Sequence, residues 1–499
     1  MNFLASIKAN RLLMLLTFGF ALLYFYSTLF FFKIGNIYLF ILLALGGVYH
    51  LFQVFAYIYG VWPRKRELEF DEKFEPPIAV FITVCGEPKE IVEETVIAAL
   101  AMEYKKHRIY LLNDGLVAKR PNWQECEDLA VQYGITCITR KVPGGAKAGN
   151  INNAIRETKE KFFVVFDADH VPHTDFLKQM VGYFVDKKVA FVQSPQYYKN
   201  HEMNLVTSGS WEQQALFFGA IMKGKNQTNT AFMCGTNMIL RRSAILEIGG
   251  MVETNIAEDF LSSLLIHEKG YKSVYVPKVL AEGLAPEDFL SYYKQQFRWA
   301  RGSLEIVFGY NPFFRKGLTL NQKIQYLASA SYYVSGAVVA MNAALPLLYF
   351  FAGIEPLAVG TMTLALIFLP YMFFVLYNLQ LTSNFSYTFR ALCFSLSSFP
   401  LHLQAIWQIL TGKKSGFAVT SKTALKGNYS YLVTPHLVYI ALVVFGVGVA
   451  FVREGLSPAL LSNLTWAGIY IAIFLPFINA ATQNAALEEE TPNDYIRND

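Results

Sequence analysis

Two carboxylates, Asp167 and Asp169, stand one residue apart directly after a short apolar run. The run, residues 162–166 (FFVVF), has the composition of a buried strand. Carboxylates on a strand end and the turn after it can both reach one hard divalent cation, and Mg²⁺ or Mn²⁺ accepts a few carboxylates together with phosphate oxygens. Many D-x-D pairs arise by chance, so it is the preceding strand that favours a metal site able to hold a diphosphate.

Two other stretches place polar groups after apolar runs. Asp114 ends such a run in YLLNDG (110–115) and can accept hydrogen bonds from a base or ribose, although Asn-Asp-Gly is also ordinary turn chemistry. In PGGAKAGNINNAI (143–155), the two glycines let the backbone approach a ligand, and Lys147 supplies a cation. The G-K-[ST] ending of a phosphate-binding P-loop is absent.

Glu258 and Asp259, in AEDF (257–260), stand where a helical pattern begins. One interpretation is an acidic first turn that favours the helix dipole. The other is a general base that takes the proton of an acceptor hydroxyl.

The stretch SYYKQQFRWARG (291–302) combines aromatic and polar residues on one predicted helix. Gln295, Arg298 and Trp299 are three and four residues apart, so they share a face. Arginine suits bidentate binding of a diphosphate, and tryptophan offers a flat surface on which a sugar ring can stack. An amphipathic helix at a membrane surface fits the same pattern.

Short apolar runs and helical patterns alternate from about residue 76 to 310, which predicts a mostly parallel α/β sheet with helices on both faces. Ligands of such sheets bind beyond the carboxyl ends of the strands, where Asp114 and Asp167 fall. The predicted strands are 78–84, 108–113, 162–166, 189–193 and 273–276, and the predicted helices are 90–102, 148–159 and 174–185.

The chain is 54% hydrophobic and only 16% charged over 499 residues, which predicts membrane embedding. The run 386–411 is interrupted by Arg390, Pro400, His402, Gln404 and Gln408, and its crossing would put a basic segment outside, so we expect an interfacial amphipathic helix there. Basic residues flanking the first hairpin place the segment after residue 64 in the cytosol. The six predicted spans are 12–32, 37–62, 328–352, 357–379, 431–452 and 461–480.

The net charge of +5 is modest, and no basic patch interleaved with aromatic residues suggests nucleic-acid binding. We interpret the basic residues as juxtamembrane anchors to lipid. The five cysteines show no C-x-x-C spacing, and most lie in the predicted cytosolic part, where thiols stay reduced.

The motifs occur in an order and at a spacing that resemble the processive family-two glycosyltransferases, with bacterial cellulose synthase catalytic subunits as the nearest likeness. The likeness covers about residues 76–430 and the flanking spans. The Q-x-x-R-W motif and the F-x-V-T-x-K loop are specific to membrane-integrated polymerases. The matching residues are Asp114, DAD at 167–169, ED at 258–259, QQFRW at 295–299 and FAVTSK at 417–422.

The resemblance implies a cytosolic GT-A glycosyltransferase domain on a membrane channel. Such an enzyme would polymerise a UDP-sugar, UDP-glucose above all, with Mg²⁺ or Mn²⁺ as cofactor, invert the anomeric centre and export the growing polysaccharide. It would be a multi-pass protein of the inner or plasma membrane, and an export partner subunit stays open. The implied parts are a transmembrane hairpin (1–66), the GT-A domain (67–310), a channel region (311–483) with a gating loop (412–428), and an acidic tail (484–499).

The resemblance also assigns roles to residues. Asp259 would be the general base, with Glu258 beside it, and Asp167 and Asp169 would serve nucleotide and metal. The gating loop would close over the donor through Phe417, Thr420 and Lys422. The remaining substrate-binding residues would be Glu87 in the first-strand motif, Asp114 at the base, Lys147, Cys234 and Gly235 on the acceptor side, and Gln295, Arg298 and Trp299 at the diphosphate and terminal sugar.

Departures from the family pattern widen the range of possible functions. Ala257 replaces a threonine beside the base, and the first strand ends in VCGEP rather than Tyr-Asn-Glu-Pro. No PilZ domain for cyclic di-GMP is expected, and the spans are fewer than in full-length bacterial cellulose synthases. The same machinery could make a β-1,3- or mixed-linkage glucan, or a hyaluronan- or chitin-like polymer. The chain could also be a non-processive glycolipid transferase, or an inactive transporter or scaffold.

Overall fold

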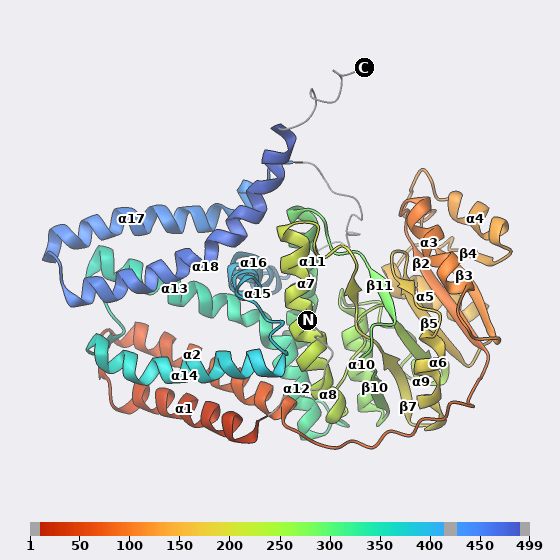
Figure 1. Ribbon diagram of the computed structural model, residues 1–499, viewed down its shortest axis with the longest axis horizontal. Coiled ribbons are helices and arrows are strands. Elements are labelled where there is room, and N and C mark those ends of the chain that lie inside the picture. The colour runs from red at the N-terminus through yellow and green to blue at the C-terminus, as the bar shows by residue number, and fades with distance from the viewer. Residues whose placement is uncertain (1–9, 414–426, 490–499) are drawn as a thin grey trace.

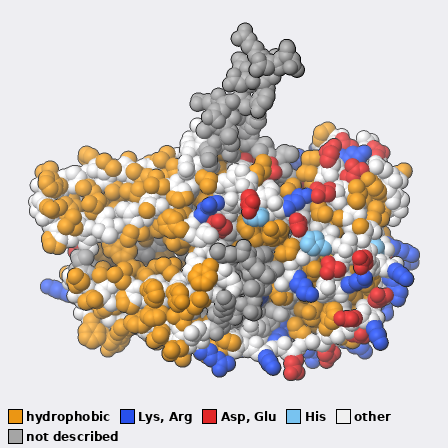
Figure 2. Space-filling view, in the orientation of Figure 1, with side chains coloured by type: hydrophobic (Ala, Val, Ile, Leu, Met, Phe, Trp, Pro, Cys, Tyr) orange, Lys and Arg blue, Asp and Glu red, His pale blue; other side chains and the backbone are white. Residues whose placement is uncertain are grey.

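A computed structural model of the chain describes residues 10–413 and 427–489. It has two parts that lie side by side: a sheet covered by helices, and a bundle of long helices (Figure 1). Hydrophobic side chains gather over the bundle, whereas charged ones concentrate on the sheet-containing part (Figure 2). This distribution is the one expected when only the bundle faces lipid.

In the described part of the chain, the larger sheet has seven strands in the order β10-β7-β9-β5-β2-β3-β4. Neighbouring strands are parallel except β9, which runs antiparallel to both β5 and β7. The mostly parallel sheet and its five predicted strands are therefore confirmed, and β4 and β9 are additions. The strands are β2 (Ile78–Val84), β3 (His107–Asn113), β4 (Thr136–Thr139), β5 (Phe162–Asp167), β7 (Val189–Gln193), β9 (Met238–Arg241) and β10 (Lys272–Tyr275).

Strand β2 lies inside this sheet, between β5 and β3, and all seven of its residues are buried. Side chains alternate between the two faces of a strand, so Ile78, Val80, Ile82 and Val84 enter one apolar core while Phe81 enters the other. A strand buried on both faces has a continuous apolar sequence, as β2 has.

Helices cover both faces of the sheet, as the alternating pattern predicts. The helices against one core are α3 (Lys89–Leu100), α4 (Glu125–Tyr133) and α6 (Phe176–Val181). Those against the other are α5 (Ala146–Glu157), α9 (Arg242–Glu247) and α10 (Glu258–Glu268). The carboxyl edge of the sheet is left for polar groups.

A smaller sheet lies beyond the end of β5. Its strands are β6 (Val171–Pro172), β11 (Ala281–Gly283) and β8 (Tyr197–Tyr198), with β11 between the other two. It ties the chain that leaves β5 to the segment that leads into α11 (Phe289–Glu305).

Helices α11 and α7 (Leu205–Leu216) lie between the sheet and the bundle, across the direction of the long helices (Figure 1). Helix α11 contacts α16 (Phe399–Leu410), and α7 contacts α15 (Phe389–Ser397). The predicted helix with the Gln-Arg-Trp face is thus α11, and it joins the two parts of the molecule.

Six helical segments of the described chain are long and apolar enough to cross a membrane. They match the six predicted spans, although the third starts earlier because α12 (Leu320–Ser331) continues through a 3-10 turn into α13 (Ser335–Ala352). The segments are Arg11–Phe30 (α1), Ile37–Val61 (α2), Leu320–Ala352, Met362–Thr382 within α14 (Thr361–Thr382), Ser430–Glu454 with α17 (Thr434–Glu454), and Pro458–Thr482 within α18 (Pro458–Glu489).

The interrupted run 386–411 forms α15 and α16, of 9 and 12 residues. They meet at Ser398, just before Pro400, whose ring cannot continue a preceding helix. Neither helix has the roughly 20 residues that a span needs, so the run does not cross as one helix. Its placement at a membrane interface stays a prediction.

Candidate active site

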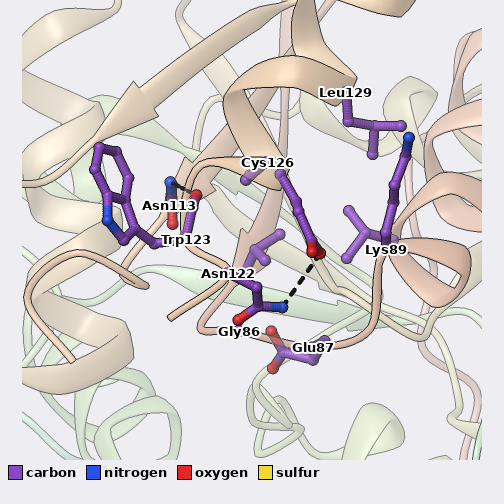
Figure 3. A pocket seen from close by; sticks show the side chains of 11 residues that line it. Gly86, Glu87, Lys89, Asn113, Asn122, Trp123, Cys126 and Leu129 are labelled. Carbon is purple, nitrogen blue, oxygen red and sulfur yellow. Dashed lines mark hydrogen bonds between the residues drawn. The ribbon is translucent and has the colours of Figure 1, made fainter. Parts of the chain in front are cut away.

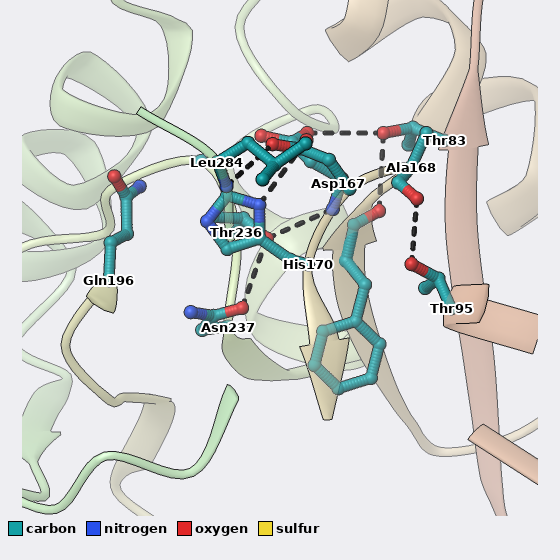
Figure 4. A network of polar contacts seen from close by, with 12 residues as sticks. Thr83, Thr95, Asp167, Ala168, His170, Gln196, Thr236, Asn237 and Leu284 are labelled. Carbon is teal, nitrogen blue, oxygen red and sulfur yellow. Dashed lines mark hydrogen bonds and ion pairs between the residues drawn. The ribbon is translucent and has the colours of Figure 1, made fainter. Parts of the chain in front are cut away.

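Asp167, Asp169 and His170 bring three ligand atoms within 4.8 Å of one another at the end of β5. Figure 4 shows this group with the polar contacts that hold it. The Asp167 N–H donates to Thr236 Oγ1 at 2.9 Å, and Thr83 Oγ1 donates to Asp167 Oδ1 at 3.3 Å. The site therefore sits on the backbone of β5 and its neighbours and not on a free loop.

The small sheet holds the other two ligands. Asp169 Oδ2 accepts the Leu284 N–H at 3.2 Å, and its Oδ1 lies 3.4 Å from His170 Nδ1. His170 Nε2 is buried and has no hydrogen-bond partner among the described residues. A side chain on Gly283 would bring its Cβ to 2.5 Å from the His170 ring, so this glycine gives the imidazole its room.

These residues fit a divalent cation. Two carboxylates are ligands that Mg²⁺ and Mn²⁺ accept, and imidazole suits transition metals such as Mn²⁺. The unpartnered ring nitrogen of His170 is a donor atom that a metal would satisfy. The sequence prediction named only Asp167 and Asp169, because a histidine after D-x-D carries no signal until the fold turns it back toward the acids.

Lys147 connects this metal-binding group to the predicted general base. At the start of α5, its Nζ forms an ion pair with Asp167 Oδ1 and donates to the Gly235 carbonyl at 2.8 Å. A Cβ on Gly235 would lie 3.3 Å from Asp259 Oδ2 and 3.8 Å from Lys147 Nζ. Gly235 also has φ +81°, which favours glycine. Asp167 and Asp259 therefore lie on two sides of one lysine.

Asp259 and Glu258 begin helix α10, as predicted. Asp259 Oδ1 accepts the Phe260 N–H at 2.7 Å, which leaves Oδ2 facing Gly235. Burial raises the pKa of Asp259, and it raises the pKa of Glu258 together with the Asp259 charge. The positive charges of Lys147 and Arg298 lower the pKa of both carboxyls in part. A carboxylate with a raised pKa suits proton acceptance.

Helix α11 contributes Gln295, Arg298 and Trp299. Gln295 is 9% exposed, and its Oε1 has no partner within the described chain. The influence of Arg298 on both α10 acids puts its guanidinium near the cleft. Trp299 is half-buried, and its position at a channel mouth stays a prediction.

Asp114 follows β3 and is buried against Arg140, which the sequence did not single out. Arg140 Nε donates to Asp114 Oδ1 at 2.7 Å, and Nη2 donates to Oδ2 at 2.6 Å. Burial raises the pKa of Asp114, and Arg140 lowers it in part. Arg140 also donates to the carbonyls of Gly144 and Ala146, so it links Asp114 to the start of α5, where Lys147 lies. The predicted contact of Asp114 with a base stays a prediction.

Glu87 and Cys234 occupy different surroundings. Glu87 accepts the Cys85 N–H at 2.5 Å and lines a pocket with Asn113, Asn122 and Trp123 (Figure 3). Cys234 lies next to Gly235, and burial together with the Asp259 charge raises the pKa of its thiol. The predicted gating-loop residues Phe417, Thr420 and Lys422 lie outside the described residues.

The mixed sheet with its acids at the end of β5 is a GT-A-like glycosyltransferase fold. A solved mannosyltransferase from Pyrobaculum calidifontis, in complex with GDP-Man and Mn²⁺, aligns with 74% of this chain and 98% of its own at a TM-score of 0.50 and 16% identity. At this identity the likeness concerns the fold alone.

Sequence comparison defines the chain more narrowly. Residues 76–302 match the family described as "Glycosyltransferase like family 2", and residues 246–478 match the family "Cellulose synthase". The two matches together cover residues 76–478. The predicted resemblance is confirmed, and the two matches overlap across α10 and α11, where Asp259 and Arg298 lie.

Among curated relatives, the cellulose synthase catalytic subunit [UDP-forming] of Pseudomonas fluorescens is 29% identical over 458 residues, 88% of this chain and 61% of the relative. The subunit of the same description from Xanthomonas axonopodis pv. citri is 34% identical over 312 residues, 60% of this chain and 41% of the relative. The chain thus spans less than two thirds of the length of these relatives.

Proposed function

We propose that this protein is a processive, inverting β-glycosyltransferase that polymerises a UDP-sugar and exports the chain through its own helix bundle. The favoured donor is UDP-glucose and the favoured product a cellulose-like β-glucan. The similarity to cellulose synthase catalytic subunits named as UDP-forming supports the donor and the product class.

One observation carries the proposal. Lys147 and Gly235 bring the candidate metal ligand Asp167 and the helix-terminal acid Asp259 close together. A donor diphosphate at the first acid and an acceptor hydroxyl at the second would then be neighbours. Positioning of this kind is a large part of the catalysis of group transfer.

Asp167, Asp169 and His170 would hold the divalent cation, which when bound supplies positive charge to the leaving diphosphate. Lys147 and Arg298 add fixed positive charge at the same place. Gln295, next to Arg298 on the inward face of α11, would complete the diphosphate site.

The reaction needs one base and one displacement. Asp259 accepts the proton of the acceptor hydroxyl while its oxygen bonds to the anomeric carbon of the sugar. The bond from that carbon to the diphosphate oxygen breaks, and UDP leaves with the electron pair. A single displacement inverts the anomeric centre, so an α-linked donor gives a β-linked polymer.

The location of the enzyme and the path of its product are also part of the proposal. The helix bundle would lie in the inner or plasma membrane, in contact with lipid, with the sheet-containing part in the cytosol. The polysaccharide would enter the bundle near Trp299 and leave on the far side, and an export partner subunit could receive it there. Binding of nucleic acid plays no part in the proposal.

Purified protein in detergent, given single radiolabelled UDP-sugars with Mg²⁺ or Mn²⁺, tests the proposal directly. We expect a long polymer from UDP-glucose that a β-1,4-glucanase digests. Digestion only by a β-1,3-glucanase would change the linkage, and soluble short products would rule out processivity.

Asp259→Asn is the matching variant. It keeps an oxygen for the Phe260 N–H but removes the base, so we expect polymer synthesis to fall by about 10²–10⁴-fold with UDP binding nearly unchanged. Asp175→Asn is the control, because Asp175 also stands at a helix start but makes no side-chain cap bond there. Loss of UDP binding in Asp259→Asn would make this residue a ligand and not the base.

A further inference from the structure

Tyr198 is a buried tyrosine beside the metal-binding acids that no predicted motif includes. It is 2% exposed and pairs in the small sheet with Gly283, the residue that makes room for His170. Leu284, the next residue, donates its N–H to Asp169. The small sheet therefore brings the Tyr198 side chain to the site that Asp169 and His170 define.

Charged groups of the candidate site act on the Tyr198 hydroxyl. Burial raises this pKa most, and the charges of Asp169 and Asp167 raise it further, whereas the charge of Arg298 lowers it. The carboxylates and the guanidinium of α11 therefore act on the hydroxyl with opposite sign, and the pairing of Tyr198 with Gly283 places it on the strand next to the one that holds Asp169 and His170. These are the two groups that would bind a diphosphate between them.

The oxygen of this hydroxyl accepts hydrogen bonds from amides. Gln214 Nε2 of α7 donates to it at 3.0 Å. Gln295 of α11 also hydrogen-bonds it and lowers its pKa, which is the effect of an N–H donor that favours the ionised form. Both bonds occupy the oxygen, and neither uses the hydroxyl proton.

Within the described residues, the Tyr198 proton has no acceptor. Buried polar hydrogens normally have one, and an unused donor inside a protein is costly. A tyrosine hydroxyl carries its proton at neutral pH. The Tyr198 hydroxyl, whose oxygen accepts from two glutamines, can therefore donate its proton to an anionic oxygen of a ligand.

We propose that the Tyr198 hydroxyl donates a hydrogen bond to a phosphate oxygen of the bound nucleoside diphosphate, between the metal side at Asp169 and the arginine side at Arg298. This inference rests on the proposed function and adds a diphosphate contact to it. Gln214 and Gln295 then act as positioning residues, because their amides turn the hydroxyl proton toward the ligand.

The test is the affinity of the full-length protein in detergent for UDP and for uridine, each with EDTA and with Mn²⁺. We expect Tyr198→Phe to weaken UDP binding by about tenfold in both conditions, the size of one hydrogen bond to a charged group. Uridine, which has no phosphate, should bind within about twofold of wild type.

Three results would overturn the inference. Loss of UDP affinity only with Mn²⁺ would mean that the hydroxyl serves Asp169 and not the phosphate. Equal loss for uridine would mean a general disturbance of the pocket, and unchanged UDP affinity would exclude the contact. If wild-type protein fails to bind UDP at all, the proposed function itself fails, so the two failures are distinguishable.

Two further variants keep the test decisive. Tyr275→Phe is the matched control: Tyr275 is equally buried, but its hydroxyl donates to the Phe218 carbonyl at 2.9 Å, so UDP affinity should not change. If Tyr198→Phe does not fold, Gln214→Met retains the phenol and removes one orienting amide. It should weaken UDP binding about threefold and spare uridine, and equal affinity for UDP would refute the contact.

Discussion

Removing the Arg140 side chain should reveal how strongly the surroundings of Asp114 depend on one buried ion pair. Both oxygens of Asp114 accept from Arg140, at 2.7 and 2.6 Å, and both side chains are less than a tenth exposed. Arg140→Met would leave a buried carboxylate without its partner, which typically costs about 3–5 kcal/mol.

That cost converts into a measurable change in thermal stability. For a unit of about 240 residues, 1 kcal/mol corresponds to roughly 2–4 °C in Tm, so we expect Arg140→Met to lower Tm by about 10 °C. Asp114 already has a raised pKa, and loss of Arg140 raises it further. A raised folded pKa means that stability falls as pH rises through it, so the deficit should be larger at pH 8 than at pH 5.

The double variant Asp114→Leu with Arg140→Met provides the control. If the single loss comes from an unpaired charge, removal of that charge should recover about 2 kcal/mol or more. Thermal melts in detergent at both pH values, with UDP binding in parallel, measure the set. A single variant within about 2 °C of wild type, or a double variant no better than the single one, would refute the reasoning.

Four further variants or profiles probe individual contacts. Gly283→Ala should displace His170 and weaken activation by Mn²⁺, because the new Cβ would lie 2.5 Å from the His170 ring. The control Gly309→Ala has nothing within 4 Å of its Cβ and should be neutral. Equal Mn²⁺ titrations of the two variants would contradict this. The acid limb of the pH–rate profile should lie above pH 4, the ordinary pKa of an aspartate being about 4, since burial raises the pKa of Asp259. An acid limb at about pH 4 would exclude Asp259 as the base. Asp259→Asn should raise Tm, and more at pH 8 than at pH 5. The pKa of Asp259 is raised in the folded protein, so its ionised carboxylate destabilises the fold. A lower Tm of the variant at both pH values would count against this. Burial lowers the pKa of Lys225 to about 7, so the Tm of the wild-type protein should rise between pH 7 and 9.5. This rise should vanish in Lys225→Met. Parallel curves of Tm against pH for the two proteins would refute this role of Lys225.

Much of the fold could be predicted because its signals are local. The five predicted strands are short runs dominated by apolar residues, and the six spans have the length and composition of membrane helices. Strand β9 escaped prediction because MILR is four residues long and has no periodicity to separate it from a helix.

The residues of the candidate site could also be predicted only in part. Acids at strand ends and helix starts could be named from the sequence, since their positions follow from the elements that carry them. Arg140, His170 and Tyr198 could not, because each reaches the cleft through contacts between distant segments. Arg66, which follows the second span, donates to the carbonyls of Asn226 and Ser273, a tertiary contact that charge patterning does not reveal.

The reversed direction of β9 determines which part of the chain meets the acceptor. The parallel strands end at the edge where Asp167 lies, so the segments that follow them lie at that edge. Strand β9 runs antiparallel to β5 and β7, so the segment that precedes it lies there. Gly235 and Thr236 arrive at Asp167 by this route. Changes in the length of the turn between α8 (Met222–Gln227) and β9 would therefore reshape the acceptor side while the strands beneath the nucleotide keep their register.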